Sequence, residues 1–178
     1  MNDTARGERR LYGDAGLIAQ QLANMQLMET SVGDYAAVYK DPVTGTFWLR
    51  YYATAAAQGG GYLTLMRLPA PTIEELIDIA ITTRFEDEAV AAMLRLLDEE
   101  AIDKKHFSEL LVEKLERQQP ESEQQKQRLL RLIKLTGLDD PMNRREVLQR
   151  SRQQVEQDAV YFKAVAGRAA SLLEKLQA

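Results

Sequence analysis

The sequence predicts an α+β protein: a small helix-capped antiparallel sheet near the N-terminus, followed by a helical region of four to five helices. Aromatic and β-branched residues, which favour strands, concentrate between positions 35 and 68. From residue 72 onward the apolar residues recur at helical spacing instead. We therefore expect a sheet region at residues 1–86 and a helical region at 87–178. The sequence leaves open whether the two regions pack as one unit.

The first helix is expected from Asp14 to about Glu29. Asp14 is a favourable N-cap, and apolar residues recur near the helical period between Leu17 and Met28. Residues 31–34 should end this helix, and residues 35–40 should form a strand. A small sheet needs a covering layer over its apolar face, so we expect the helix to lie over the sheet.

Two further strands are predicted around a glycine-rich connection. Residues 41–45, Asp-Pro-Val-Thr-Gly, predict a tight turn, because proline fixes φ and glycine readily adopts positive φ. Residues 46–52 then have the composition of a strand, and residues 62–68 should form its antiparallel partner. Gly59, Gly60 and Gly61 should form an exposed connection between these strands, with positive φ at one glycine or more.

Side chains alternate along the central strand and fall into two sets: Phe47, Leu49 and Tyr51 on one face, and Trp48, Arg50 and Tyr52 on the other. If the first helix covers the second set, Trp48 and Tyr52 are core residues. If it covers the first set, an aromatic–arginine–aromatic row is exposed. Trp, Tyr and Arg are the residue types that dominate binding hot spots. Both arrangements are compatible with the sequence.

Five helices are predicted after the sheet, and they begin near Thr72, Asp87, Asp103, Glu121 and Asn143. Thr72 and Glu75 have the spacing of a capping box, and Gly137 is a natural C-cap. The last helix should run to about Leu176 with apolar residues at alternating spacings of four and three: Val155, Ala159, Phe162, Ala166, Ala169, Leu173 and Leu176. This seam either packs within a bundle, which we favour, or forms a dimer or partner-binding coil.

The sequence offers no recognisable catalytic or metal-binding set. It has no cysteine and a single histidine, His106, so it lacks a disulfide framework, the usual zinc ligands and a Cys–His pair. Acidic runs on predicted helices are typical of solvated faces or caps. The glycine triplet lacks the residues that make a phosphate loop. We therefore expect a protein with no enzymatic activity, no metal and no cofactor.

Charge and hydropathy narrow the choice of partners. The net charge of −4 argues against nucleic acid as the general partner. Residues 126–152 hold eight basic residues against three acidic ones, and we interpret them as a solvated helical surface rather than a nucleic-acid patch. No apolar run approaches the ~18 residues of a membrane span, and the first ten residues lack the core of a secretory signal. We expect a cytoplasmic protein without a membrane partner.

A set of residues with defined spacing lies in the central region: Tyr39, Asp41, Pro42, Gly45, Trp48, Tyr52, Gly59, Gly60 and Gly61. Their order and gaps resemble the core signature of immunity protein family 27, from bacterial polymorphic toxin systems. The sequence departs from that pattern at Leu49, where the family tends to have an acidic residue. It also departs at Ala53 and Tyr62, where the family often has proline.

The resemblance implies a protein that neutralises a cognate toxin by binding it directly. We expect the partner-binding residues to be Trp48, Arg50, Tyr52, Gly59, Gly60 and Gly61. The negative net charge would suit a basic toxin such as a nuclease. The alternative is a helical scaffold or regulatory module that acts through the basic stretch or the last helix, on nucleic acid for example. The identity of the toxin and the oligomeric state stay open.

Overall fold

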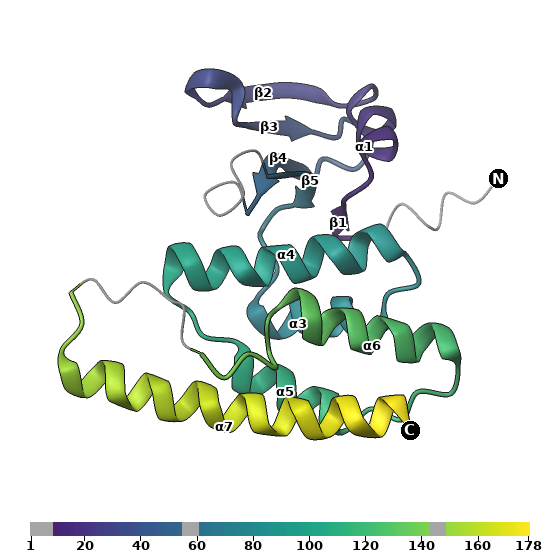
Figure 1. The fold of residues 1–178 in the computed structure, drawn as a ribbon. Coiled ribbons are helices and arrows are strands. Elements are labelled where there is room, and N and C mark those ends of the chain that lie inside the picture. Colours follow the sequence, from purple (N-terminus) through teal and green to yellow (C-terminus); the bar gives the residue numbers. More distant parts are fainter. Residues whose placement is uncertain (1–8, 55–60, 143–148) are drawn as a thin grey trace. The chain divides into compact units, whose positions relative to one another are not determined.

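The computed structural model describes residues 9–54, 61–142 and 149–178 (Figure 1). Within these ranges the chain forms one five-stranded antiparallel sheet and six α-helices, which confirms the α+β class. The chain divides into two compact units, Met1–Asp98 and Glu99–Ala178. The sequence placed the boundary near residue 86, whereas the structure groups the first part of helix α4, Glu86–Asp103, with the sheet.

The sheet has two strands more than predicted. Its strands are β1 Leu11–Tyr12, β2 Gln26–Thr30, β3 Ala36–Lys40, β4 Phe47–Ala53 and β5 Tyr62–Arg67, in the order β1-β5-β4-β3-β2. Strands β3, β4 and β5 are the predicted meander, and each pairs antiparallel with the next. Gly59 and Gly60 lie outside the described residues. Gly61, directly before β5, has φ of +68°, in line with the predicted positive φ.

The first helix is shorter than predicted. Helix α1 spans Ala15–Leu22, and the Asp14 carboxylate accepts a hydrogen bond from the Leu17 amide as the expected N-cap. The predicted end near Glu29 is wrong, because strand β2 begins at Gln26 and pairs with β3. The helical spacing continued past the helix because Met25 packs on the same cluster as Leu17. Tertiary packing, rather than a longer helix, therefore explains that part of the pattern.

Helix α1 covers the sheet face that carries Trp48. Trp48 and Ile18 belong to one buried cluster with Tyr12 and Leu65, and the rings of Tyr12 and Trp48 are 5.8 Å apart. The opposite face is covered as well, because the Arg95 guanidinium of α4 lies 5.7 Å from the centre of the buried Tyr51 ring. The two arrangements considered from the sequence are therefore not exclusive: β4 has cover on both faces.

Strand β1 is held by a carboxylate at the start of α4. Glu88 is only 4% exposed, and its Oε1 accepts hydrogen bonds from the backbone amides of Arg10 and Leu11, at 2.7 and 3.1 Å. Its other oxygen accepts from the Thr83 hydroxyl at 2.5 Å. A buried carboxylate needs such donors to offset its desolvation. A strand of two residues is stable here because Glu88 accepts hydrogen bonds from the backbone amides that do not pair within the sheet.

The adjacent Asp87 fastens the turn that follows β1. Its Oδ2 accepts from Arg9 at 2.6 Å and from the backbone amides of Gly13 and Asp14, at 3.0 and 3.3 Å. Burial by itself would raise the pKa of Asp87. The hydrogen bonds from Gly13, Arg9 and Asp14, together with the charge of Arg9, outweigh burial and hold the pKa below its ordinary value.

Strand β4 ends at a third carboxylate of α4. Thr54 has φ of +55°, and its backbone amide donates to both oxygens of the buried Asp98, at 2.9 and 3.1 Å. A β-branched residue in this conformation is strained, so the two bonds to Asp98 help to hold it there. Helix α4 therefore binds the sheet unit near both of its ends.

The helices after the sheet agree with the prediction in number and order. They are α3 Ile73–Thr82, α4 Glu86–Asp103, α5 Ser108–Glu116, α6 Glu123–Leu135 and α7 Arg152–Gln177. Both bonds of the Thr72–Glu75 capping box form, and Gly137 has φ of +64° after α6. Helix α5 starts later than the predicted Asp103, because Lys104 takes φ of +56° and interrupts the helix. None of the described helices is long and apolar enough to cross a bilayer.

Helix α7 begins later than predicted. Asn143 lies outside the described residues, but Gln149 has φ of +66° and Ser151 caps the helix in a capping box with Gln154. A continuous helix from residue 143 is therefore wrong. The residues that α7 buries are Phe162, Val165, Ala166, Ala169 and Leu172.

The predicted seam is only partly buried. Its Ala159 is exposed, as is the neighbouring Val160, so the buried stripe begins at Phe162. From there α7 packs against α5 within its unit: Arg168 donates two hydrogen bonds to Glu116, and the Tyr161 hydroxyl accepts from the Glu109 amide. The favoured interpretation, packing within a bundle, fits this part of the helix.

Replacing Phe162 by Asp should destabilise the helical unit by roughly 3 kcal/mol or more, because a charge would enter a buried apolar stripe. Val160 is 71% exposed on the same helix, so Val160→Asp should leave stability nearly unchanged. Thermal and urea unfolding of both variants would measure this. A lowered oligomer size with an unchanged melting temperature for Phe162→Asp would instead identify the stripe as an association surface.

Asp87→Asn should lower the free energy of unfolding at neutral pH. The folded pKa of Asp87 lies below its unfolded value of about 3.9, so its stabilisation is complete above that pH and is lost as the pH falls through the folded pKa. The difference between wild type and variant should therefore shrink as a series of urea titrations moves from pH 7 towards acid. Asp103→Asn, at an exposed carboxylate, is the control. A difference that does not change with pH would contradict the assignment.

Candidate protein-interaction surface

Strand β4 directs Trp48, Arg50 and Tyr52 to one face of the sheet, as the alternation predicted. The strand register pairs Trp48 with Tyr39 of β3 and pairs Tyr52 with Leu63 of β5. Residues that pair across an antiparallel ladder share a face. The three predicted partner-binding side chains have different environments on that face.

Trp48 is a core residue. It is 5% exposed, it packs in the cluster under α1, and its indole nitrogen donates to the Thr46 hydroxyl at 3.0 Å. Little of its surface is available to a partner. Trp48 therefore lies in the part of this face that α1 covers, as in the first of the two arrangements considered from the sequence.

Arg50 fastens the loop between β2 and β3. Its Nη2 donates to the Asp34 carboxylate at 2.6 Å and to the Asp34 carbonyl at 3.1 Å. The Arg50 side chain is 13% exposed and that of Asp34 is 71% exposed. Asp34 and the preceding Gly33 both have positive φ, at +58° and +79°, so the chain turns sharply there. The ion pair holds this turn against β4 and leaves the Asp34 carboxylate facing solvent.

Tyr52 is exposed, and other exposed apolar side chains lie on the same face of the sheet. Tyr52 is 36% exposed, Tyr35 in the loop before β3 is 72% exposed, and Leu27 of β2 is 51% exposed. Leu27 pairs with the half-buried Tyr39, which pairs in turn with Trp48 on the same face. We call this set the tyrosine face: Leu27, Tyr35, Tyr39, Arg50 and Tyr52.

The tyrosine face is open because the helices leave the β2 side of the sheet uncovered. The cluster under α1 involves β1, β4 and β5, whereas all five residues of β2 are exposed. Figure 1 shows the β2–β3 hairpin on the side of the sheet away from α4. Strand β2 is also an edge strand, with a bulge between Leu27 and Glu29. An edge strand offers unpaired backbone groups to another chain.

The sequence alone did not assemble this face. Leu27 was assigned to a helix, and Tyr35 and Tyr39 were only parts of a predicted strand. The alternation of Tyr35, Ala37 and Tyr39 would have been a usable signal had the register with β4 been known. Long-range strand pairing supplies that register, and local sequence pattern does not.

The other residues singled out from the sequence contribute less. His106 is exposed, and its ring lies against Phe162 with ring centres 5.5 Å apart and its Nδ1 3.6 Å from Glu100. Within the described ranges, no cluster of His, Cys, Asp and Glu has an arrangement that could hold a metal ion.

Three described cations of the basic stretch are paired with carboxylates, and a fourth is buried. Ion pairs join Lys134 to Asp139, Arg150 to Asp158 and Arg152 to Glu156, and Arg128 is buried. Arg144 and Arg145 lie outside the described residues. Paired cations release few counterions on binding nucleic acid, so these residues give a nucleic-acid role no support.

Comparison of the chain with models of protein families, with curated proteins and with solved structures gives no match. The resemblance to immunity protein family 27 therefore rests on the signature residues themselves. Several of these build the β3–β4 hairpin. Asp41 accepts hydrogen bonds from the Val43 and Gly45 amides, and Gly45 has φ of +71°. Of the signature side chains, Tyr39 and Tyr52 reach the tyrosine face.

Gly33→Ala should loosen the loop that Arg50 fastens. An added Cβ would lie 2.7 Å from the Tyr35 ring, at a backbone φ of +79° that L side chains rarely adopt. We expect a loss of roughly 1 kcal/mol of stability and faster hydrogen exchange at the Ala36 amide, which donates to Ser31.

The control is Gly167→Ala in α7, where an added Cβ meets open space. This change should stabilise the chain by about 0.5–1 kcal/mol, because alanine is the better helix former. Unchanged exchange at Ala36 in Gly33→Ala would contradict the role assigned to this turn.

Proposed function

We propose that this protein is an immunity protein, which neutralises a cognate bacterial toxin by binding it through the tyrosine face. The observation that carries the proposal is the exposure of Tyr35, Tyr52 and Leu27 on the sheet face that also carries Arg50. Tyrosine and arginine are enriched in binding hot spots, and exposed apolar patches mark interaction sites. The resemblance of residues 39–61 to the immunity protein signature supports the choice of a toxin as the partner.

The tyrosine face suits binding because its supports are rigid. Trp48 and Tyr12 pack beside it under α1, and the bond to Asp34 holds the Arg50 guanidinium in place. A surface ordered before binding loses less conformational entropy when the partner docks. Tyrosine also presents a large contact area for the loss of only two side-chain torsions.

The negative charge of the chain favours a basic toxin as the partner. The chain carries a net charge of −4, and the Asp34 carboxylate beside Arg50 is 71% exposed. Opposite charge on the partner would speed association and favour one docking orientation. A nuclease, which binds a polyanion, is one class of toxin with such a charge. Inhibition would then follow from occlusion of the basic surface.

Tyr52→Ala should weaken binding of the toxin by about 1–2 kcal/mol, because the side chain presents apolar area on the proposed contact surface. Tyr62→Ala is the matched control: Tyr62 is 53% exposed and pairs with Ala53, on the opposite face from Tyr52. Affinity would be measured by calorimetric titration with the toxic domain of a secreted protein encoded beside this chain. Growth of sensitive cells that express both proteins gives a second readout.

Arg50→Ala is a less selective probe than Tyr52→Ala, because it also releases the Asp34 turn. We expect it to lose about 1 kcal/mol or more of affinity as well. Equal affinity of wild type, Tyr52→Ala and Tyr62→Ala would remove the tyrosine face from the contact. Failure of the wild-type chain to protect cells from the adjacent toxin would overturn the proposed function itself.

A further inference from the structure

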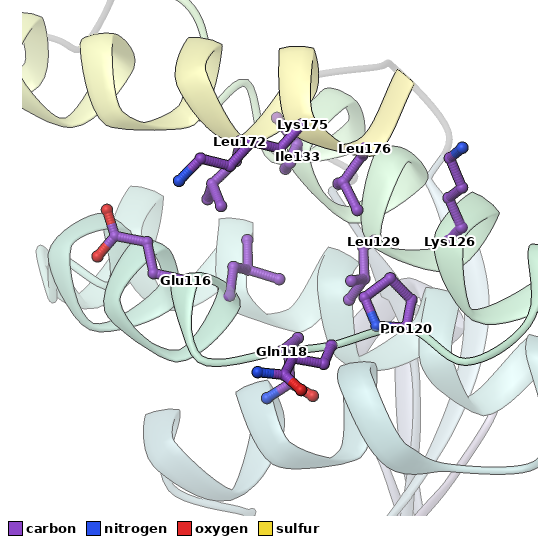
Figure 2. A pocket seen from close by; sticks show the side chains of 11 residues that line it. Glu116, Gln118, Pro120, Lys126, Leu129, Ile133, Leu172, Lys175 and Leu176 are labelled. Carbon is purple, nitrogen blue, oxygen red and sulfur yellow. The ribbon is translucent and has the colours of Figure 1, made fainter. Parts of the chain in front are cut away.

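The helical unit contains a pocket that lies outside the proposed interaction surface. Its volume is about 400 Å³, and it is lined by the end of α5, the loop that follows, helix α6 and the last turns of α7 (Figure 2). This volume lies within the range of small-molecule sites, roughly 300–1,000 Å³. All of the lining residues belong to the unit Glu99–Ala178.

The pocket lies where the chain breaks between α5 and α6. Pro120 lies in the loop between them, and Ser122 caps the new helix through the Gln125 amide. The double hydrogen bond from Arg168 to Glu116 fixes α7 beside α5. These contacts fix where α5, α6 and α7 lie around the pocket.

The walls of the pocket combine apolar side chains with Gln118 and Gln119, and its rim is charged. Leu115, Leu129, Ile133 and Leu172 line it and are buried from solvent. Figure 2 shows Leu129, Leu172 and Leu176 around the hollow, with Lys126 and Lys175 at its edge. An apolar group that enters the hollow would add dispersion contacts with the part of this wall that the protein leaves open.

The charges at the rim favour an anion. Glu116 is the acidic residue of the lining, and its two oxygens accept from Arg168 at 2.8 and 2.5 Å. The hydrogen bond from Arg168, with the charges of Arg168 and Lys175, keeps the pKa of Glu116 below its ordinary value against the opposing effect of burial. The rim therefore carries two lysines, Lys126 and Lys175, against one carboxylate that already accepts from Arg168.

We infer that this pocket binds a small amphipathic carboxylate, with its alkyl or aryl tail among the leucines and its carboxylate against Lys126 or Lys175. The tail gains from removal of apolar surface from water. The carboxylate gains charge-assisted hydrogen bonds from the lysines. Lysine serves here as a mobile point charge on a flexible stem, so either residue can reach a carboxylate at the rim.

Titration of the full chain with octanoate tests the inference. Calorimetry should show saturable binding, and the methyl resonances of Leu129, Ile133 and Leu172 should shift while those of the sheet unit stay in place. Octylamine, which has the same tail and the opposite charge, should bind about tenfold more weakly. Leu176→Trp, which places bulk at the hollow, should abolish the binding of octanoate.

Variants of the rim separate charge recognition from general hydrophobic binding. Lys126→Glu or Lys175→Glu should weaken octanoate binding about tenfold or more, whereas Lys163→Glu should not. Lys163 is an exposed lysine of α7 that does not line the pocket, so this control makes the same change of charge on the same unit. The inference is overturned if octylamine binds as tightly as octanoate, if the three glutamate variants bind equally, or if the pocket methyl resonances do not shift.

Discussion

The sheet unit depends on three carboxylates of α4 that bind backbone amides. Glu88 and Asp87 hold the chain before and after β1, and Asp98 holds the end of β4. Each bond satisfies an amide that the sheet ladder does not pair, so the desolvation of the carboxylate is offset at the same place. Without Glu88, a strand of two residues would have little to keep it beside β5. Without β1, Trp48 would lose the Tyr12 ring from its packing.

Because α4 is attached in this way, the two faces of the sheet differ in how far helices cover them. Helix α4 occupies one face through Arg95, while α1 covers only part of the other. The uncovered part carries aromatic side chains whose backbone is fixed by the buried half of the same strands. A partner could therefore dock without ordering the sheet first. Within the helical unit, the Arg168–Glu116 pair holds α7 beside α5. The pocket lies next to this pair.

Much of the fold could be predicted from local pattern, and the missing parts depend on distant contacts. The Thr72–Glu75 capping box and the glycine after α6 act within a few residues, so they could be recognised directly. Strand β1 could not, because its amides are satisfied by Glu88 at a separation of 77 residues. The burial of Trp48 and the exposure of Tyr52, on one strand face, were also unpredictable, since they depend on where α1 ends. Tyr35 and Leu27 join the candidate surface only through the register of β2, β3 and β4.

The bulge in β2 has a consequence for how the protein behaves at high concentration. A regular edge strand with exposed apolar side chains can pair with its own copy and add further copies without limit. In β2 the ladder shifts register between Leu27 and Glu29, so a second β2 could match it only over a short length on either side of Met28. The irregularity thus works against open-ended self-assembly, while a partner with a complementary surface could still use the edge.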